Sequence, residues 1–311
     1  MGLLTRLFTR NESDPEILPA IERAVARVDA NLVMAGGYPE KYRKPVETGL
    51  EYARHLASIL PGPVTLDRKS FATDPLVHAI FPDPDSISET FRESHSMIDF
   101  RKENPESSEV FALMGMRRME KRRMGYELSG DLLKRDSMQK VVYFTSHTIE
   151  NPAGSEERSR DLIGLSFFDS LIASVAKRMN RRREEMSRLS SEKDLLASSL
   201  HGADPAERER IGRELERIVR EMQQCAQSLD LRQAVSDFEE VLFHPEQYLG
   251  LDRTELSLDG MGIRQQESGN AIVFNDLFGY DRRRWTVTMV HCSQIGTESA
   301  TPGAFPRKMA I

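Results

Sequence analysis

The chain has 311 residues, of which 39% are hydrophobic and 30% are charged, and its formal net charge is −6. This length suffices for one large domain or two smaller ones with a real core, and the charge content favours exposed helices. The acidic balance excludes nucleic-acid binding driven by overall charge, but it leaves room for a local basic patch. With only two cysteines and no apolar run near the ~20 residues of a membrane span, we expect a cytoplasmic protein without a disulfide framework.

Residues 1–14 are predicted to form a leader ahead of the folded chain. Residues 1–10 (MGLLTRLFTR) combine leucines with two arginines, but they are too short and too interrupted for the apolar region of a signal peptide. We expect this leader to be flexible or to dock on the protein itself. A weak amphipathic membrane contact by residues 1–10 is the less favoured alternative.

Residues 15–106 are predicted to be helical. A first helix ends at Gly36-Gly37, and its apolar residues recur in steps of three and four: Leu18, Ile21, Val25, Val28 and Leu32. A second helix is expected from about Pro39 to Leu60, and shorter ones begin at Asp74-Pro75 and near Asp85. The acids Asp83 and Asp85 flank a proline before a helix, which fits capping better than metal binding.

Residues 107–154 and 243–295 are predicted to form a β-rich head. Before the arm, the segments 110–114, 123–128 and 139–145 read as three short strands of an antiparallel meander. After the arm, residues 255–258, 271–274 and 285–290 supply three more strands. Since the two groups flank one insertion, we expect a single shared antiparallel sheet, so the fold class is α+β. Residues 296–311 contain two prolines and favour a flexible tail.

Residues 155–242 carry the most informative pattern, a heptad-like apolar seam that predicts a long antiparallel coiled-coil hairpin. The sequence at residues 201–205 (HGADP) predicts the turn, because Asp204 suits an N-cap and Pro205 the first helical position. The first limb carries the seam residues Leu165, Phe168, Ile172, Val175, Met179, Met186, Leu189, Leu196 and Leu200. The second limb carries Ile211, Leu215, Ile218, Met222, Cys225 and Leu229, after which the phase changes and Asp230 begins a new helix.

The seam contains two cations, Arg182 and Lys193, which interrupt the apolar positions. Facing residues in an antiparallel hairpin have a constant sum of residue numbers, and a turn at 201–204 favours 404 over 411. With the sum of 404, Met179 is opposite Cys225, and Arg182 faces Met222. We interpret the cations as polar anchors of register, with dimerisation through the seam as the main alternative.

Motifs that carry catalysis are absent from the sequence. It has no phosphate-binding GxxxxGK[ST], HExxH, GxSxG, paired CxxC or GxGxxG pattern. The two SxxK matches lie on the predicted arm, where an exposed helical hairpin cannot enclose a protected active-site pocket. His147, His291 and Cys292 lie near strands, and we interpret them as structural residues. We therefore predict no catalytic residue, no metal and no cofactor.

Three basic clusters are the remaining functional clue. The cluster at the first meander turn contains Arg117, Arg118, Lys121, Arg122 and Arg123; the arm base contributes Arg181 and Arg183; and Trp285 is preceded by Arg282, Arg283 and Arg284. If the clusters converge, they form a positive surface for nucleic acid or an acidic partner. Nearby glutamates favour solvated faces as the alternative. We predict a non-enzymatic scaffold or adaptor that uses its arm to bind a protein partner or to self-associate as a homodimer, with a nucleic-acid-associated factor as the alternative.

Overall fold

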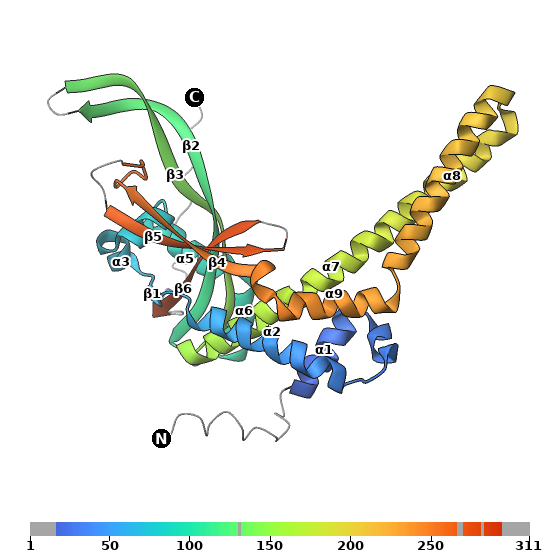
Figure 1. The fold of residues 1–311 in the computed structure, drawn as a ribbon. Coiled ribbons are helices and arrows are strands. Elements are labelled where there is room, and N and C mark those ends of the chain that lie inside the picture. Colours follow the sequence, from blue (N-terminus) through green and yellow to red (C-terminus); the bar gives the residue numbers. More distant parts are fainter. Residues whose placement is uncertain (1–16, 130–131, 266–269, 281–282, 294–311) are drawn as a thin grey trace, which may run out of the picture. The chain divides into compact units, whose positions relative to one another are not determined.

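The computed structural model describes residues 17–129, 132–265, 270–280 and 283–293, and it has an α+β fold (Figure 1). The chain divides into two compact units. One unit comprises Met1–His55 and Gly164–Gly250, and we call it the arm unit. The other comprises Leu56–Ile163 and Leu251–Ile311, and we call it the sheet unit. The predicted helical region is thereby divided, because its first two helices belong to the arm unit and the later ones to the sheet unit.

The arm unit is helical. Its elements, three of which continue into the sheet unit, are α1 (Ile17–Val28), the 3₁₀ helix η1 (Ala30–Ala35), α2 (Glu40–Ser58), α7 (Glu156–Ser199), η2 (Leu200–Gly202), α8 (Pro205–Ser228), α9 (Leu231–Phe243), η3 (Pro245–Gln247) and β4 (Leu249–Leu258). Tyr42 is fully buried, donates to the Leu32 carbonyl at 2.8 Å and meets the Phe238 ring edge-on at 5.1 Å. Gly49 lets α2 approach α9, because a Cβ there would lie 2.7 Å from a methyl group of Leu242.

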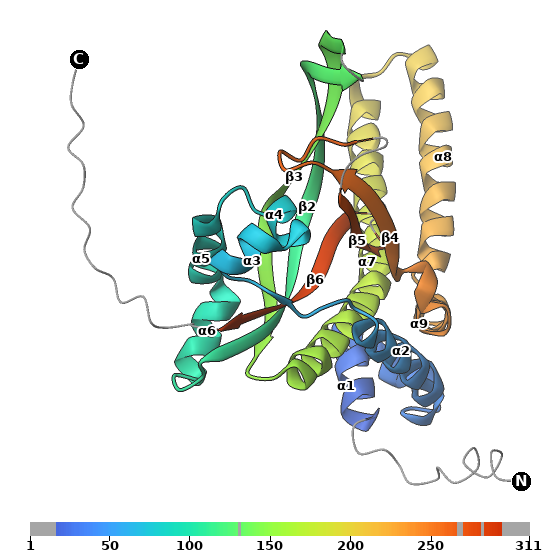
Figure 2. The same cartoon turned by 90° about the vertical axis from the view of Figure 1, so that its left-hand side faces the viewer.

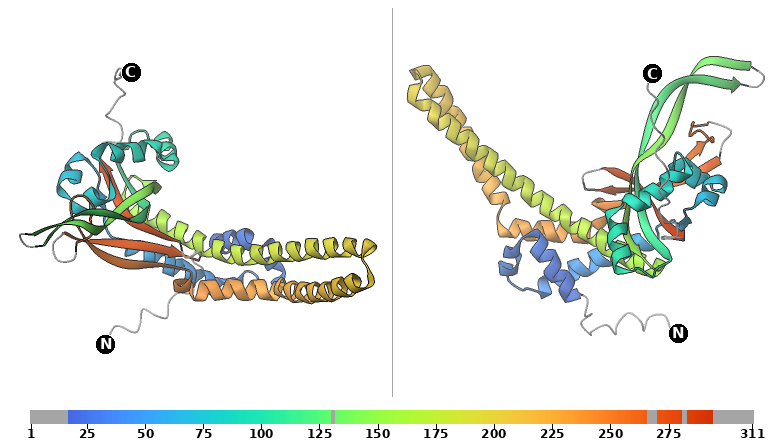
Figure 3. Two further views of the ribbon diagram at one scale, coloured as in Figure 1. Left: turned by 90° about the horizontal axis from the view of Figure 1, so that it is seen from above. Right: turned by 180° about the vertical axis from the view of Figure 1, so that it is seen from behind.

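The helices α7 and α8 form a hairpin whose outer part extends past the other helices of the arm unit (Figure 3). Asp204 caps α8 as the sequence predicts, since its carboxylate accepts the Glu207 amide at 2.9 Å, and Pro205 opens the helix. At 1.5 Å per residue, the 44 residues of α7 span about 66 Å. We call residues 184–228 the distal arm. The interactions described for these residues stay within the hairpin, apart from backbone bonds that join the last turn of α8 to Leu229 and Asp230.

The sheet unit holds an antiparallel sheet with the strand order β3-β2-β6-β5-β4, to which β1 adds a short parallel pairing with β6. The strands not yet given are β1 (Val64–Thr65), β2 (Glu109–Ser129), β3 (Leu132–Ala153), β5 (Asn270–Gly279) and β6 (Arg284–Ser293). One face is covered by α3 (Arg68–Thr73), α4 (Pro75–Ile80), α5 (Pro84–Glu93) and α6 (His95–Glu103) (Figure 2). The core between these layers includes Phe81, Phe91, Met114, Phe144 and Phe274.

The chain that follows β4 returns to the free edge of β3. Ile263 bridges Val141, the Val142 amide donates to the Gly262 carbonyl at 2.8 Å, and the Arg264 amide donates to the Lys140 carbonyl at 2.9 Å. Gly262 is required here, because its φ is +71° and a Cβ would lie 2.5 Å from the Val142 carbonyl oxygen. This return covers part of the β3 edge that a simple five-strand order would leave open.

The predicted meander of three short strands is wrong. The segments 110–114 and 123–128 belong to one strand, β2, which pairs with β3 as a single long hairpin. The described pairs between β2 and β6 end at Met116, so beyond it β2 pairs with β3 alone, and we call β2 and β3 in this part the ribbon. Most side chains of residues 117–124 are exposed on both faces of β2, and the alternation that marks a strand is therefore missing from this part of the sequence.

The predicted strands after the arm are confirmed. Residues 255–258, 271–274 and 285–290 lie within β4, β5 and β6, respectively. None of the helices in the described ranges combines the length and the hydropathy that crossing a bilayer requires. The predicted leader (residues 1–14) and tail (residues 296–311) lie outside the described residues.

Candidate functional site

The seam residues of the predicted arm all lie at buried or half-buried positions. The buried ones are Phe168, Ile172, Val175, Met179, Leu189, Ile211 and Ile218. The half-buried ones are Leu165, Met186, Leu196, Leu200, Leu215, Met222, Cys225 and Leu229. The lower part of the first limb packs in the helical core of the arm unit, where the Phe168 ring lies 3.5 Å from the Cβ position of Gly49 on α2.

Two described contacts across the hairpin can be compared with the predicted register. The Cys225 thiol contacts the Arg182 carbonyl at 3.3 Å, and Arg217 contacts Glu192 at 3.4 Å. The residue numbers of these pairs sum to 407 and 409, between the predicted 404 and its alternative 411. Helical side chains lean toward the N-terminus of their own helix, so in an antiparallel pair the side chains that meet come from unequal heights. The sequence argument had paired residues at equal height.

The seam cation Arg182 has a partner that the sequence reading missed. It makes a two-pronged contact with the carboxylate of Asp237 on α9. Asp237 is fully buried and also lies 3.4 Å from Arg178 and 3.3 Å from the amide nitrogen of Gln233. A buried carboxylate needs such a set of donors, because desolvation otherwise opposes its charge.

The same network reaches the end of α9. Arg178 donates to the Tyr248 hydroxyl at 2.9 Å, and that hydroxyl donates to Glu240 at 2.7 Å. The hydrogen bond from Tyr248, and after it a bond from Arg178 at 3.3 Å, lower the pKa of Glu240. The network joins α7 to α9 at the base of the distal arm, which fixes the direction in which the hairpin leaves the helical core.

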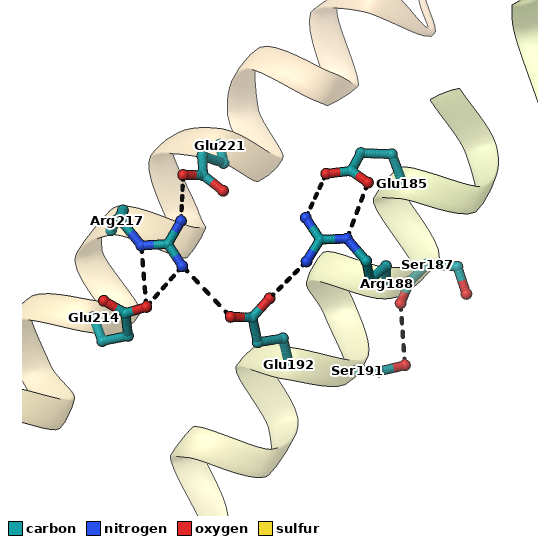
Figure 4. Close-up of polar contacts among 8 residues, drawn as sticks. All are labelled: Glu185, Ser187, Arg188, Ser191, Glu192, Glu214, Arg217 and Glu221. Carbon is teal, nitrogen blue, oxygen red and sulfur yellow. Dashed lines mark hydrogen bonds and ion pairs between the residues drawn. The ribbon is translucent and has the colours of Figure 1, made fainter. Parts of the chain in front are cut away.

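Six charged residues of the distal arm form a connected set of ion pairs, which we call the charge ladder: Glu185, Arg188, Glu192, Glu214, Arg217 and Glu221 (Figure 4). Arg188 bonds Glu185 and Glu192 on its own helix, whereas Arg217 bonds Glu214 and Glu221 on α8 and crosses to Glu192 on α7. The hydrogen bond from Arg217 lowers the pKa of Glu214, and that from Arg188 lowers the pKa of Glu185. Figure 4 shows that Glu192 joins the two arginines, so the ladder links both limbs of the hairpin.

Two large apolar side chains of the distal arm are exposed, and one of them lies near its turn. Leu195 is 70% exposed, one turn before the end of α7, and Val219 on α8 is 42% exposed. Near Leu195 the residues Leu196 and Leu200 are half-buried. The arm thus presents a charged surface with a small apolar spot near the tip, while its seam is occupied from within the chain.

The basic clusters have different surroundings in the two units. On the arm base, Arg183 pairs with Asp29, and Arg181 also has an interaction. In the sheet unit, Arg118 reaches the buried Asp276 at 2.7 Å and lies over the Phe274 ring. Arg284 pairs with Asp252 at 2.8 Å. Arg283 has an interaction as well, and Arg282 lies outside the described residues.

The largest predicted basic cluster lies on a strand and not at a turn, which corrects the sequence reading. Arg117, Lys121, Arg122 and Arg123 all belong to β2, and all four are exposed. Within the described part of the chain, none of these four has an ion pair or side-chain hydrogen bond. They are therefore the cations of the predicted site that remain available to a ligand.

The histidines have structural partners and do not share a site. His147 stacks on Phe81 at 4.9 Å and contacts the Ile80 carbonyl at 2.8 Å, and burial lowers its pKa. His291 stacks on Phe111 at 4.6 Å, at a different level of the sheet. Cys292 is partly buried, and this burial raises the pKa of its thiol, which disfavours the thiolate. Among the described residues, no three His, Cys, Asp or Glu side chains are grouped closely enough to hold a metal ion.

A cavity of about 330 Å³ in the sheet unit is lined by residues of α4, β3 and the loop after β4. Its polar groups are engaged by the fold: His78 contacts the Gly260 carbonyl at 3.0 Å, and Asp259 accepts the amides of Met261 and Ile263. These hydrogen bonds hold the loop after β4 in place, and the residues that line this cavity include no nucleophile paired with a base. No protein-family model, curated protein or solved structure matches the chain.

Proposed function

We propose that the chain is a non-enzymatic adaptor that binds a protein partner through the distal arm, in a reducing cytoplasm. The observation that carries this proposal is that the hairpin extends past its helical core while its outer surface has no described partner. A long hairpin costs conformational entropy to order, and only its seam burial offsets that cost. A partner that binds the outer surface gives such an extension a role.

The partner is a different protein rather than a second copy of the chain. Seam residues such as Leu189 and Ile218 are at most 2% exposed, so dimerisation through the seam requires the hairpin to open. The Arg217–Glu192 contact opposes that opening. The exposed Leu195 provides an apolar anchor, and the surrounding ladder provides a polar rim, which is the usual composition of a protein interface.

The experiment is an affinity purification with nuclease treatment, comparing the intact chain with one in which a short Gly-Ser turn replaces residues 186–218. This deletion keeps Arg182 and Asp237, and with them the network that anchors the base. We expect a protein that survives nuclease and is lost with the deletion. Capture that is unchanged by the deletion contradicts the adaptor proposal.

A point variant tests the same surface without shortening the arm. Leu195→Lys places a charge at the exposed apolar spot, and Ser187→Lys is its control on an exposed position of the same helix. We expect the Leu195 variant to weaken capture of the partner by about tenfold, which corresponds to loss of one apolar anchor, and the control to leave it unchanged. Equal capture by both variants moves the proposed contact away from the tip. Circular dichroism verifies that both variants keep their helix content.

A further inference from the structure

We propose that one face of the β2–β3 ribbon binds single-stranded nucleic acid. This surface is distinct from the distal arm, so the inference goes beyond the proposed adaptor function. We call it the ribbon face, and its residues are Arg117, Met119, Lys121, Arg123, Gln139, Val141, Tyr143 and Thr145. Cross-strand pairing defines it: Arg117 is opposite Thr145, Met119 opposite Tyr143, Lys121 opposite Val141 and Arg123 opposite Gln139.

The two faces of the ribbon differ in charge. Strand side chains alternate, so the opposite face carries Arg118, Glu120, Arg122 and Lys140, together with the core residues Val142 and Phe144. That face includes a carboxylate, and its Arg118 is paired with Asp276. The ribbon face carries three exposed cations and no carboxylate among its eight positions.

The cations of the ribbon face are free to meet phosphates. None of Arg117, Lys121 and Arg123 has an ion pair in the part of the chain that the structure describes, although the sequence has 49 acidic residues and 43 Lys and Arg residues. At about 3.4 Å per residue, they follow the strand over about 20 Å, a length suited to several nucleotides of an extended backbone.

An aromatic ring lies among these cations. Tyr143 is 40% exposed and faces Met119, which is 39% exposed, across the strand pair. Single-stranded nucleic acid is bound by a combination of cations along the backbone and aromatic rings on which bases stack. Duplex bases are already stacked, and an acidic peptide has no flat base to place on the ring. The combination therefore favours a single strand over both.

Fluorescence anisotropy with labelled oligo(dT) and oligo(U) of about 16 nucleotides tests the proposal on the full chain. We expect both oligonucleotides to bind at low salt. The logarithm of the binding constant should fall with the logarithm of the salt concentration with a slope of about −2, since single strands give about −0.7 per neutralised phosphate and the ribbon face has three cations. A duplex of the same length and poly-glutamate serve as competitors, and a stronger effect of either one overturns the proposal.

Matched variants separate the ribbon face from its reverse side. Arg117→Gln with Arg123→Gln removes two cations from the ribbon face, whereas Arg122→Gln with Lys140→Gln removes two from the opposite face of the same ribbon. We expect the first pair to weaken oligo(dT) binding by about tenfold or more at ~50 mM salt and to flatten the salt slope. Equal losses in both pairs indicate attraction to overall charge and overturn the proposed site.

Tyr143 provides a test that does not involve charge. Tyr143→Ala is expected to weaken binding by about tenfold, and Tyr143→Phe is expected to preserve it, because stacking needs the ring and not the hydroxyl. No loss in the alanine variant overturns the stacking role. All these side chains are exposed, and thermal melting of each variant verifies that the ribbon remains folded. Loss of the adaptor function on deletion of the arm leaves these results unaffected.

Discussion

The distal arm and the ribbon are both hairpins that extend beyond the packed elements of their own unit, and both carry several cations. On the distal arm, Arg188 and Arg217 are each bonded by two or more glutamates. On the ribbon face, Arg117 and Arg123 have no described ion pair. An arginine that is already paired with glutamates of its own chain must break those ion pairs before it binds a ligand. Arginines on the ribbon face are therefore more available to a ligand than those on the distal arm.

The two hairpins also differ in how they are held at their base. The distal arm leaves a helical core through a buried ionic network around Asp237, whereas the ribbon is an extension of two strands that are already paired within the sheet. The arm therefore depends on a few specific side chains, while the ribbon depends on backbone hydrogen bonds. The predictions below test this difference, from the largest expected effect to the smallest.

Removing the buried carboxylate at the arm base has the largest expected effect. Asp237→Ala leaves Arg182 without its two-pronged partner and weakens the hold on Arg178. We expect the free energy of unfolding to fall by about 3–5 kcal/mol, as for other broken buried pairs. Urea unfolding followed by circular dichroism measures this change. Asp194→Ala, which removes an exposed carboxylate on the same arm, is expected to be neutral; equal effects contradict the anchoring role.

Truncating the seam has the next largest expected effect. Ile218 is fully buried between α7 and α8, and we expect Ile218→Ala to cost about 2–4 kcal/mol, because it removes apolar contacts and leaves a cavity. The neighbouring Val219 is 42% exposed, and Val219→Ala is expected to cost no more than ~0.5 kcal/mol. A similar cost for both variants in urea unfolding means that the seam is not packed within the hairpin.

Much of this architecture could be predicted from the sequence, because the signals were local. The turn follows from Asp204-Pro205, whose capping chemistry involves neighbouring residues alone. The three strands after the arm follow from short apolar runs. The outer part of β2 could not be read in the same way, because side chains on both of its faces are exposed, and the sequence of residues 117–123 lacks the alternation of a half-buried strand.

The site residues that sequence reasoning missed are those that act at long range. Arg182 was identified as an exception in the seam, but its partner is 55 residues away in sequence and on a different helix. A signal for Asp237 was present, since it shares the apolar face of α9 with Ala234, Phe238 and Val241. A cation and a carboxylate at predicted buried positions of two helices, such as Arg182 and Asp237, indicate an ion pair between those helices. Such a match still needs the relative placement of the two helices, which local sequence patterns do not give.

The sheet unit is expected to lose stability with falling pH earlier than the arm. Burial lowers the pKa of His147, and the hydrogen bond to the Ile80 carbonyl only partly offsets this effect. Below about pH 6.5 the unfolded chain therefore binds a proton that the folded chain resists, so stability falls as the pH is lowered from 7 toward the folded pKa. The carboxylates of the arm ladder have lowered pKa values, so their contribution is present above about pH 4.5 and is lost only as the pH falls further.

Trp285, the only tryptophan, lies on β6 and reports on the sheet unit by its fluorescence, whereas circular dichroism near 222 nm is dominated by the helices. We expect the fluorescence transition in urea to move to lower concentration between pH 7 and pH 5.5, and His147→Gln to flatten that dependence. His244→Gln, at an exposed position, is the control. An unchanged pH dependence in the His147 variant removes this histidine as the cause.

The smallest expected effect concerns the charge ladder of the distal arm. Arg217→Gln removes the contact with Glu192, the described ion pair that joins the two limbs, together with two contacts along α8. Exposed ion pairs contribute little and are screened by salt, so we expect a small loss at low salt that disappears near 1 M, where the Debye length is about 3 Å. Arg220→Gln, on the same helix, controls for the change in net charge. If the loss of stability persists at high salt, it comes from packing of the aliphatic stem of Arg217 on the arm and not from its charge. The ion pairs of the distal arm would then not explain how this hairpin differs from the ribbon.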